Sequence, residues 1–315
     1  MTASIVIPTY NKMSRLRLML ESFQYTKIDS DMELILVNDG STDDTRDFLI
    51  EFSGAVHIQP QITVRVINTE NKGRSAARNT GIMHSSGDCI IFLDDDVLLG
   101  ADTVTSHLAM HSRYADAVVH GKIYSLPHLK FFTDPLDGLM MNGQRAKGHL
   151  SSLVLNMQMF RDQSIIDYCN RYGKISKFEK DIEALYSKSN DNSFKWIGFT
   201  GGNVSVKKAD LIKAGMFDEQ MGVDWGCEDL ELGYRLCKLG LRFFFCNQAE
   251  VYHMNHYREN SSKIHQNALD YFIGKHRDQS IASLSDYFDK QINTLLEWEE
   301  TVKQQMADIP CLFGR

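Results

Sequence analysis

Apolar residues in the first 125 positions alternate between short runs suited to strands and longer stretches with helical spacing. The short runs predict strands at residues 4–7, 33–37, 63–67, 89–93 and 117–123. Between the first two, residues 13–23 place apolar side chains three or four positions apart, which predicts a helix with one apolar face. Pro8 is expected to end the first strand, and further helices are expected after the second and third strands. This alternation is typical of an α/β fold with a mostly parallel central sheet flanked by helices.

The second half of the chain is less regular. Residues 126–195 lose clear periodicity and are treated as an insertion. Order returns at 196–206, which ends in a strand-like VSV run, and continues with helices at 208–214 and 229–239 and an aromatic strand near 243–245. Residues 259–315 are expected to form a helical extension that packs either on the rest of the chain or on a second copy of it. We therefore predict one domain over residues 1–258, followed by this extension.

The composition excludes several classes of protein. With 43% hydrophobic and 24% charged residues over 315 positions, the chain has an ordinary globular balance. Its formal net charge of -7 argues against a nucleic-acid surface, which normally carries a basic stripe. The six cysteines form no CxxC pair, so neither a zinc knuckle nor a disulfide framework is indicated. No secretory signal and no run of about 18 apolar residues is apparent, so we expect a cytoplasmic protein whose contact with the membrane is at most peripheral.

Three consecutive aspartates, Asp94, Asp95 and Asp96, directly follow the fully apolar strand predicted at 89–93. Like charges this close raise one another's pKa, and a divalent cation removes that penalty. Mg²⁺ and Mn²⁺ prefer oxygen ligands, and ligands bind at the carboxyl ends of strands in open α/β sheets. The alternative is a solvated acidic turn. Asp39, within NDGSTDD after the second strand, is expected at the same edge, although a turn with a helix N-cap also explains that motif.

Two further motifs carry groups that suit catalysis. Glu228 and Asp229 follow Trp225 and open a predicted helix. The helix dipole stabilises their ionised forms, whereas burial beside the indole ring raises the pKa, so either a general base or simple helix capping fits. Gly202 and Asn203 belong to a GGN turn, whose glycines permit close approach of a ligand or merely a tight turn.

His253 and His256 follow the aromatic strand in the sequence VYHMNH. At this spacing, both are expected to meet one metal ion only if the segment is helical, whereas a single neutral imidazole could complete a shell of carboxylate and diphosphate. Taken alone, either residue also fits an ordinary surface or core histidine.

The order of these motifs resembles the family-2 inverting glycosyltransferases with the GT-A fold. IPTYN, VNDGSTD, N-x-G-x-x-x-A-R-N-x-G and FLDDD follow one another in the family's order over residues 4–100, and the resemblance resumes at about 196–256. It implies a nucleotide-sugar-binding half over residues 1–125, an acceptor-binding half over 196–258, and an insertion at 126–195 that faces the acceptor. The donor implied is a nucleotide diphosphate sugar, most commonly a UDP-sugar.

This resemblance also implies how the donor is bound. Pro8, Thr9, Tyr10 and Asp39 are expected to line the nucleoside pocket, and Arg78 to orient the donor.

The DDD run corresponds to the DxD motif of the family. Asp96 is expected to bind the metal ion directly, while Asp94 and Asp95 contact ribose or the donor sugar. His253 is favoured as a second metal ligand, with His256 as the fallback, and the ion is expected to be Mn²⁺ or Mg²⁺.

The WGxED pattern at residues 225–229 is similar to the acceptor-side motif of family-2 and related galactosyl- and N-acetylgalactosaminyltransferases. It implies that Asp229 is the base and that Glu228 binds acceptor or donor hydroxyls. Trp225, Gly202 and Asn203 are expected beside the donor.

The expected reaction is inverting, metal-dependent transfer of a hexose or N-acetylhexosamine to an acceptor hydroxyl, in bacterial-type polysaccharide or glycoconjugate synthesis. The acceptor stays open among a glycan, a lipid-linked saccharide, a peptide and a small molecule, and a homodimer through the C-terminal helices is one option. Two alternatives are a scaffold or nucleotide-sugar-binding protein, which loss of the base or the DDD run would favour, and a nucleotidyltransferase. The latter would normally carry a basic, Gly-rich phosphate loop where IPTYN stands.

Overall fold

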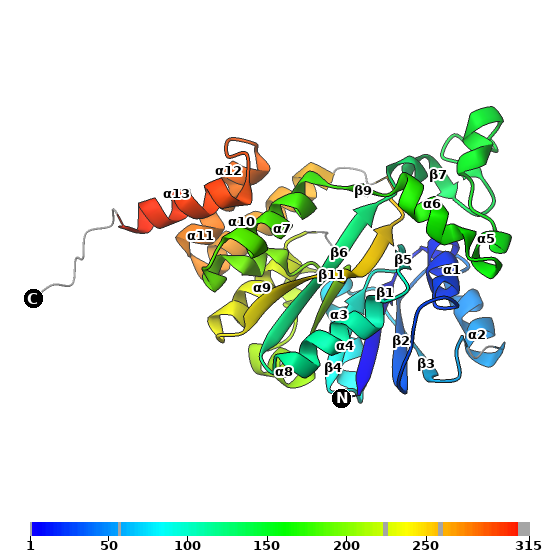
Figure 1. The fold of residues 1–315 in the computed structure, drawn as a ribbon, viewed down its shortest axis with the longest axis horizontal. Coiled ribbons are helices and arrows are strands. Elements are labelled where there is room, and N and C mark those ends of the chain that lie inside the picture. Colours follow the sequence, from blue (N-terminus) through cyan, green and yellow to red (C-terminus); the bar gives the residue numbers. More distant parts are fainter. Residues whose placement is uncertain (1, 56–57, 223–225, 258–260, 308–315) are drawn as a thin grey trace, which may run out of the picture.

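The computed structural model describes residues 2–55, 58–222, 226–257 and 261–307 (Figure 1). Within these ranges, nine strands form one sheet in the order β3-β2-β1-β4-β10-β6-β11-β5, with β9 beside β6. Their bounds are β1 (Ala3–Thr9), β2 (Met32–Asp39), β3 (Ile62–Thr69), β4 (Cys89–Leu93), β5 (Val97–Leu99), β6 (Ala117–Ser125), β9 (Lys174–Ile175), β10 (Asn203–Lys207) and β11 (Arg242–His253). Strands β3, β2, β1 and β4 pair in parallel, as do β6 and β11, while β10 runs antiparallel between the two groups. The predicted α/β class is confirmed.

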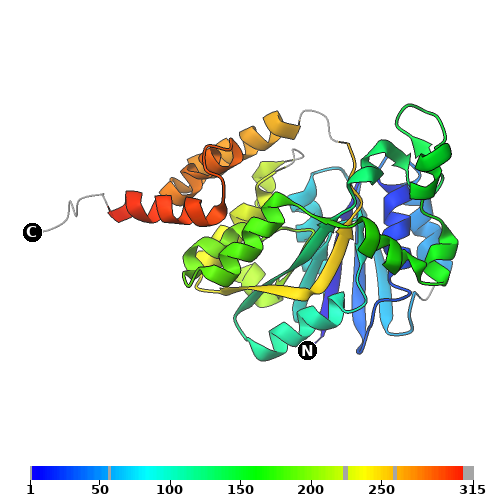
Figure 2. The same ribbon diagram turned by 45° about the horizontal axis from the view of Figure 1, so that its top comes forward.

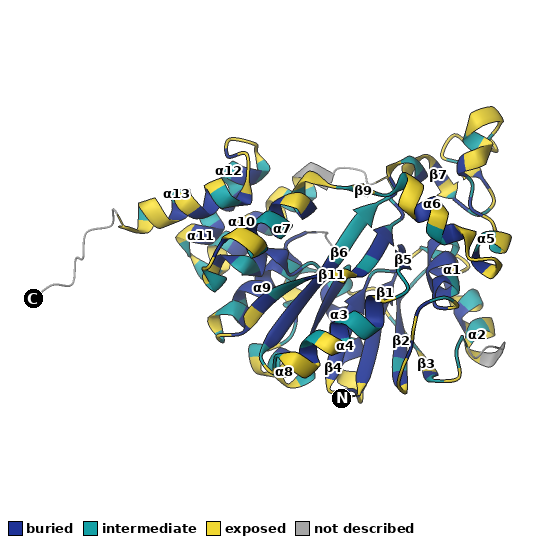
Figure 3. Ribbon diagram, in the orientation of Figure 1, coloured by how far each residue is buried: buried dark blue, intermediate teal, exposed yellow. Residues whose placement is uncertain are grey.

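Helices cover both faces of the sheet, because successive strand residues point to opposite sides. Ile5 and Ile7 of β1 join the core on the side of α1, α2 and α4, whereas Val6 faces the core that includes α3, α7, α8 and α9. The helices are α1 (Met13–Ser22), α2 (Thr45–Ala55), α3 (Arg74–His84), α4 (Thr103–Arg113), α7 (Lys177–Lys188), α8 (Lys208–Ala214) and α9 (Glu228–Lys238). Figure 3 shows the strands buried along most of their length and the outer sides of the helices exposed.

The segment 126–195 divides into two pieces that pack in different places. The first contains η1 (Pro127–Phe131), β7 (Phe132–Asp134), β8 (Leu139–Met140), η2 (Gly148–Leu153), α5 (Met157–Arg161) and α6 (Ser164–Tyr172). It forms its own apolar cluster, which includes Leu18 of α1 and Tyr252 of β11. The second piece, α7, joins the main core through Ile182 and Leu185 and leads to η3 (Asn192–Gly198).

The C-terminal helices pack on the rest of the chain, which is one of the two arrangements considered for them. They are α10 (Ser261–His276), α11 (Gln279–Ala282), α12 (Leu284–Phe288) and α13 (Leu295–Ala307). They gather at one end of the molecule, on the side of α7 and α9 (Figures 1 and 2). The rings of Phe272 and Trp298 meet Trp196 of η3 edge to face, with centroids 5.8 and 6.0 Å away. The apolar side chains of the extension are therefore part of the main core.

The first strand passes through Pro8 instead of ending there, contrary to expectation. Its pairing with β4 stops at Val6, whereas its pairing with β2 continues to Thr9. Only one neighbour remains at Pro8, and such an edge tolerates a residue without an N–H.

Two other expectations concern the chain as a whole. The five cysteines within the described ranges form no disulfide, in agreement with the sequence. Among the described helices, none has both the length and the apolar character that crossing a bilayer requires.

Candidate active site

The predicted polar residues meet at the carboxyl edge of the parallel strands. Thr9 ends β1, Asp39 ends β2, and Asp94 to Asp96 follow β4, which pairs with β1 on the side opposite β2. Because β1, β2 and β4 run in the same direction, their ends share one rim, where open α/β sheets bind ligands.

The loop around Asp39 is held by hydrogen bonds from backbone groups. Its carboxylate accepts the N–H of Lys72 and that of Gly73, both at 2.9 Å, and the side chain is buried. Asp39 therefore fixes the turn that precedes α3. Thr9 is also buried, whereas the ring of Tyr10 is 44% exposed and is available to a ligand.

The three consecutive aspartates have three different environments. Asp94 is partly exposed and lies 3.1 Å from the Arg78 guanidinium. Burial raises the pKa of Asp95 to about 6. Burial also opposes ionisation of Asp96, but Lys12 and His253 outweigh it and hold the pKa of Asp96 well below its usual range. Of Asp95 and Asp96, Asp96 is thus held more firmly as a carboxylate.

Asp96 lies against both candidate histidines. Its Oδ1 is 3.3 Å from Nε2 of His253, and its Oδ2 is 3.2 Å from Nε2 of His256. One ligand atom from each of the three residues lies within 4.8 Å of the others, which is a spacing that one metal ion can bridge. A helix is not needed for both imidazoles to face one carboxylate, because His253 ends β11 and residues 254–257 are not helical.

Arg15 and the backbone of Asp96 shape the turn between these histidines. The buried Arg15 guanidinium donates to the carbonyls of Met254 and Asn255, at 3.3 and 3.4 Å. The N–H of Met254 donates to the Asp96 carbonyl at 2.8 Å. These contacts turn His256 back toward Asp96.

A second cluster surrounds Arg78, whose side chain is only 2% exposed. Besides Asp94, its guanidinium contacts Glu228 at 3.3 Å and Asp229 at 3.0 Å, both in the first turn of α9. Burial raises the pKa of Asp229 to about 7, with Arg78 opposing the shift and Glu228 adding to it. Arg78 therefore joins the DDD run to the acidic pair, and the pKa of Asp229 suits proton transfer near neutral pH.

The GGN turn at residues 201–203 lies beneath this cluster. A Cβ added at Gly201 would stand 2.7 Å from Oδ1 of Asp229, and one added at Gly202 would stand 3.1 Å from Oδ2 of Asp94. The absence of side chains at these positions leaves room for both carboxylates.

The side chain of Asn203, expected beside the donor, is engaged within the fold. Its amide nitrogen donates to the carbonyls of Lys122 and Ala249, and its oxygen lies 2.9 Å from Nε2 of His107. The side chain is fully buried with its polar atoms engaged, so its role is to join β10, β6, β11 and α4.

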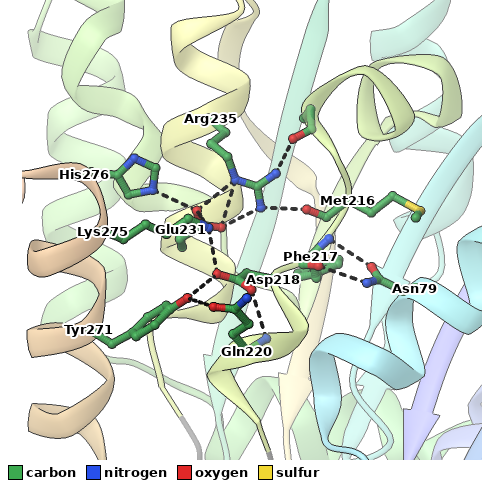
Figure 4. Close-up of polar contacts among 11 residues, drawn as sticks. Asn79, Met216, Phe217, Asp218, Gln220, Glu231, Arg235, Tyr271, Lys275 and His276 are labelled. Atoms are coloured by element: carbon green, nitrogen blue, oxygen red, sulfur yellow. Dashed lines mark hydrogen bonds and ion pairs between the residues drawn. The ribbon is translucent and has the colours of Figure 1, made fainter.

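The helix that carries Glu228 and Asp229 is held by a buried polar network, shown in Figure 4. Glu231 is fully buried and contacts Arg235 on the same helix, together with Lys275 and His276 of α10 at 2.7 and 2.8 Å. Lys275 also contacts Asp218 at 2.7 Å, in the segment that leads to the acidic pair. The network fixes α9 against the C-terminal extension.

The motif that precedes α9 is described only in part. Trp225 lies outside the described residues. Gly226 and Cys227 lie against His265 of α10, whose Nε2 is 3.7 Å from the Cys227 sulfur. Sequence reasoning missed Lys12, Arg15 and His265, although Lys12 directly follows the IPTYN motif.

The chain is similar in sequence and in fold to known glycosyltransferases. The chain is 30% identical to the uncharacterized glycosyltransferase YfnE of Bacillus subtilis over 81% of its own length and 65% of that protein. Among solved structures, a mannosyltransferase from Pyrobaculum calidifontis in complex with GDP-Man and Mn²⁺ matches with a TM-score of 0.58 and 16% identity, over 88% of this chain and 64% of that one. GalNAc-T7 with UDP, GalNAc and Mn²⁺ matches with a TM-score of 0.54 and 16% identity, over 98% of this chain and 58% of that one.

The chain thus spans less than two thirds of each of these proteins, and the two structures support the expected GT-A fold. Residues 185–258 match the family described as N-terminal domain of galactosyltransferase, a stretch that includes both α9 and β11. Residues 4–167, which carry the Asp39 loop, Arg78 and the three aspartates, match Glycosyl transferase family 2. Because that match covers more than half of the residues, the chain belongs to glycosyl transferase family 2.

Proposed function

We propose that the chain transfers a hexose or N-acetylhexosamine from a UDP-sugar to an acceptor hydroxyl, with inversion at the anomeric carbon and with help from a divalent cation. The observation that carries this proposal is the pair of linked clusters at the sheet edge. One holds the ligand set Asp96, His253 and His256, and the other holds Asp229 with its pKa near 7. Arg78 and Asp94 lie between them.

In this proposal, Asp229 is the general base. Near pH 7 a large fraction of Asp229 is ionised, because burial raises its pKa to about 7, and its carboxylate takes the proton of the attacking hydroxyl. When Asp229 becomes neutral, Arg78 keeps its contacts with Asp94 and Glu228 and therefore stays in position. A single base on the acceptor side suits a single displacement, which inverts the sugar.

The group of possible metal ligands fits a divalent cation. Asp96, His253 and His256 would hold it, and Mn²⁺ fits better than Mg²⁺ because two of these ligands are imidazoles and Mg²⁺ favours oxygen ligands. Such an ion would neutralise charge on the departing diphosphate. Two structural neighbours are complexes with Mn²⁺, which supports the same choice.

The choice of UDP rests on the resemblance and on the UDP complex of GalNAc-T7, whereas the mannosyltransferase neighbour holds GDP-Man. Calorimetric titration with UDP, GDP and TDP, each with Mn²⁺ or with chelator, tests it. We expect Mn²⁺-dependent binding of UDP that is lost in Asp96→Ala and kept in Asp47→Ala, a change at an exposed position on α2. Tight UDP binding that persists in chelator and in Asp96→Ala would contradict the proposed site.

A further inference from the structure

Lys12 forms an ion pair with the same carboxylate that is proposed to bind the metal ion. Its Nζ lies 2.8 Å from Oδ2 of Asp96, the oxygen that also faces His256. The Asp96 side chain is 3% exposed and that of Lys12 is 20% exposed, so this ion pair is largely shielded from solvent. A divalent cation on Asp96 would share this carboxylate with Lys12, and two cations on one carboxylate repel each other.

The backbone around Lys12 is fixed by hydrogen bonds, whereas its side chain is intrinsically flexible. The Lys12 carbonyl accepts the N–H groups of Arg15 and Leu16, at 3.0 and 2.9 Å, and so begins α1. The preceding Asn11 accepts the N–H of Thr42 at 2.7 Å and that of Asp43 at 3.2 Å. Movement is thus confined to the side chain, which four methylene groups make flexible.

Lys12 also stands between the two ends of the proposed donor site. The Asn11 contacts attach its loop to the turn that follows Asp39, at the nucleoside end. The Lys12 ammonium itself reaches the Asp96 cluster, at the metal end. The diphosphate of a nucleotide sugar must join these ends, so its oxygens would pass within reach of Lys12, and lysine ammonium groups bind phosphate oxygens as point charges.

We propose that Lys12 is a diphosphate-binding residue that pairs with Asp96 in the free enzyme and transfers to the diphosphate when the donor and the metal ion bind. This inference rests on the proposed donor site. Lys12 then makes the two ligands interdependent: it weakens binding of the metal ion alone and strengthens binding of the metal ion together with the nucleotide. The diphosphate supplies the negative charge that lets the ammonium leave Asp96.

The test is the binding of Mn²⁺ alone, of UDP with saturating Mn²⁺, and of uridine, by calorimetry and by the paramagnetic resonance signal of free Mn²⁺. In Lys12→Met we expect Mn²⁺ alone to bind on the order of tenfold more tightly and UDP with Mn²⁺ on the order of tenfold more weakly, which is the effect of one hydrogen bond to a charged group. Uridine, which lacks phosphate, should bind unchanged. Lys12→Arg should resemble the wild type, as should Lys27→Met, a change at a lysine whose side chain is 61% exposed.

The opposite signs of the two effects distinguish this role from damage to the site. If Lys12→Met weakens both affinities, or changes neither, while the wild-type protein binds UDP with Mn²⁺, the inference fails and the proposed function stands. If the wild-type protein itself binds no UDP with Mn²⁺, both fail together. A melting temperature within about 2 °C of wild type confirms that the variant is folded.

Discussion

Gly201 and Gly202 are neighbours, yet a methyl group at each should have very different effects. At Gly201 the added Cβ would stand 2.6 Å from Cζ of Arg78 and 2.7 Å from Oδ1 of Asp229. Arg78 cannot easily retreat, since its side chain is 2% exposed and three carboxylates hold it. Overpacking of this kind costs about 1–3 kcal/mol. If the cost falls on the geometry of the base, kcat/KM for Gly201→Ala should fall about 5- to 150-fold.

At Gly202 the added Cβ would lie 3.1 Å from Oδ2 of Asp94, whose side chain is 31% exposed and free to shift by a few tenths of an ångström. We expect a loss of about twofold or less, since surface changes usually stay within about 0.5 kcal/mol. A third variant, Gly274→Ala in α10, meets no atom within 4 Å and should stabilise the protein by about 0.4–1 kcal/mol.

The assay is the rate at which UDP is released from a UDP-sugar, with water as the acceptor, together with thermal melts of all three variants. The melts separate loss of stability from loss of catalytic geometry. Equal rates for Gly201→Ala and Gly202→Ala, or an unimpaired Gly201→Ala, would refute the packing described around Arg78 and Asp229.

Three other predictions follow from the buried charges. Asp229→Asn should gain stability relative to wild type as pH rises from about 4 to 7 and then level off. Burial raises the pKa of Asp229 to about 7, so over this range the unfolded chain releases the Asp229 proton while the folded chain keeps it. Thermal melts giving a constant difference between about pH 4 and 7 would contradict it. Arg15→Met should lower the free energy of unfolding by about 2–4 kcal/mol in urea unfolding and weaken Mn²⁺ binding at least about tenfold in calorimetry. Arg17→Met, on the exposed side of the same helix, should change neither quantity. In urea unfolding, Lys275→Met should lower the free energy of unfolding by about 1–3 kcal/mol, because it leaves the buried carboxylate of Glu231 less well paired. Lys238→Met, on the surface, should lower it by about 0–1 kcal/mol. Equal losses in the two variants would argue against the network.

The local sequence patterns correctly predicted which residues meet at the carboxyl edge of the sheet. Strand periodicity and the parallel arrangement were sufficient to bring Asp39 and the three aspartates to one rim, because parallel strands end on the same side. The contact of Asn203 with His107 of α4 was not foreseen, because no pattern near the GGN turn indicates it.

What the sequence did not indicate depends on contacts between distant residues. Arg15 lies 239 positions before Met254, the residue whose carbonyl it binds, so the turn that brings His256 back to Asp96 has no local signal. Lys12 is 84 positions from Asp96. Helix α7 was also missed, although Phe178, Ile182 and Leu185 recur within it at helical spacing.

The Glu231 network also has a consequence for the order in which the protein matures. Two of the three side chains that contact Glu231 stand at positions 275 and 276, so a ribosome must pass position 276 before this carboxylate is fully paired. Until then, Arg235 is its only partner among these three, and a buried carboxylate with incomplete pairing is costly. Residues 1–125, which carry the Asp39 end of the site, precede both Glu231 and α10 and do not depend on this network. We therefore expect a growing chain to complete the Asp39 end of its site first and to seat Asp229 only after α10 has been made.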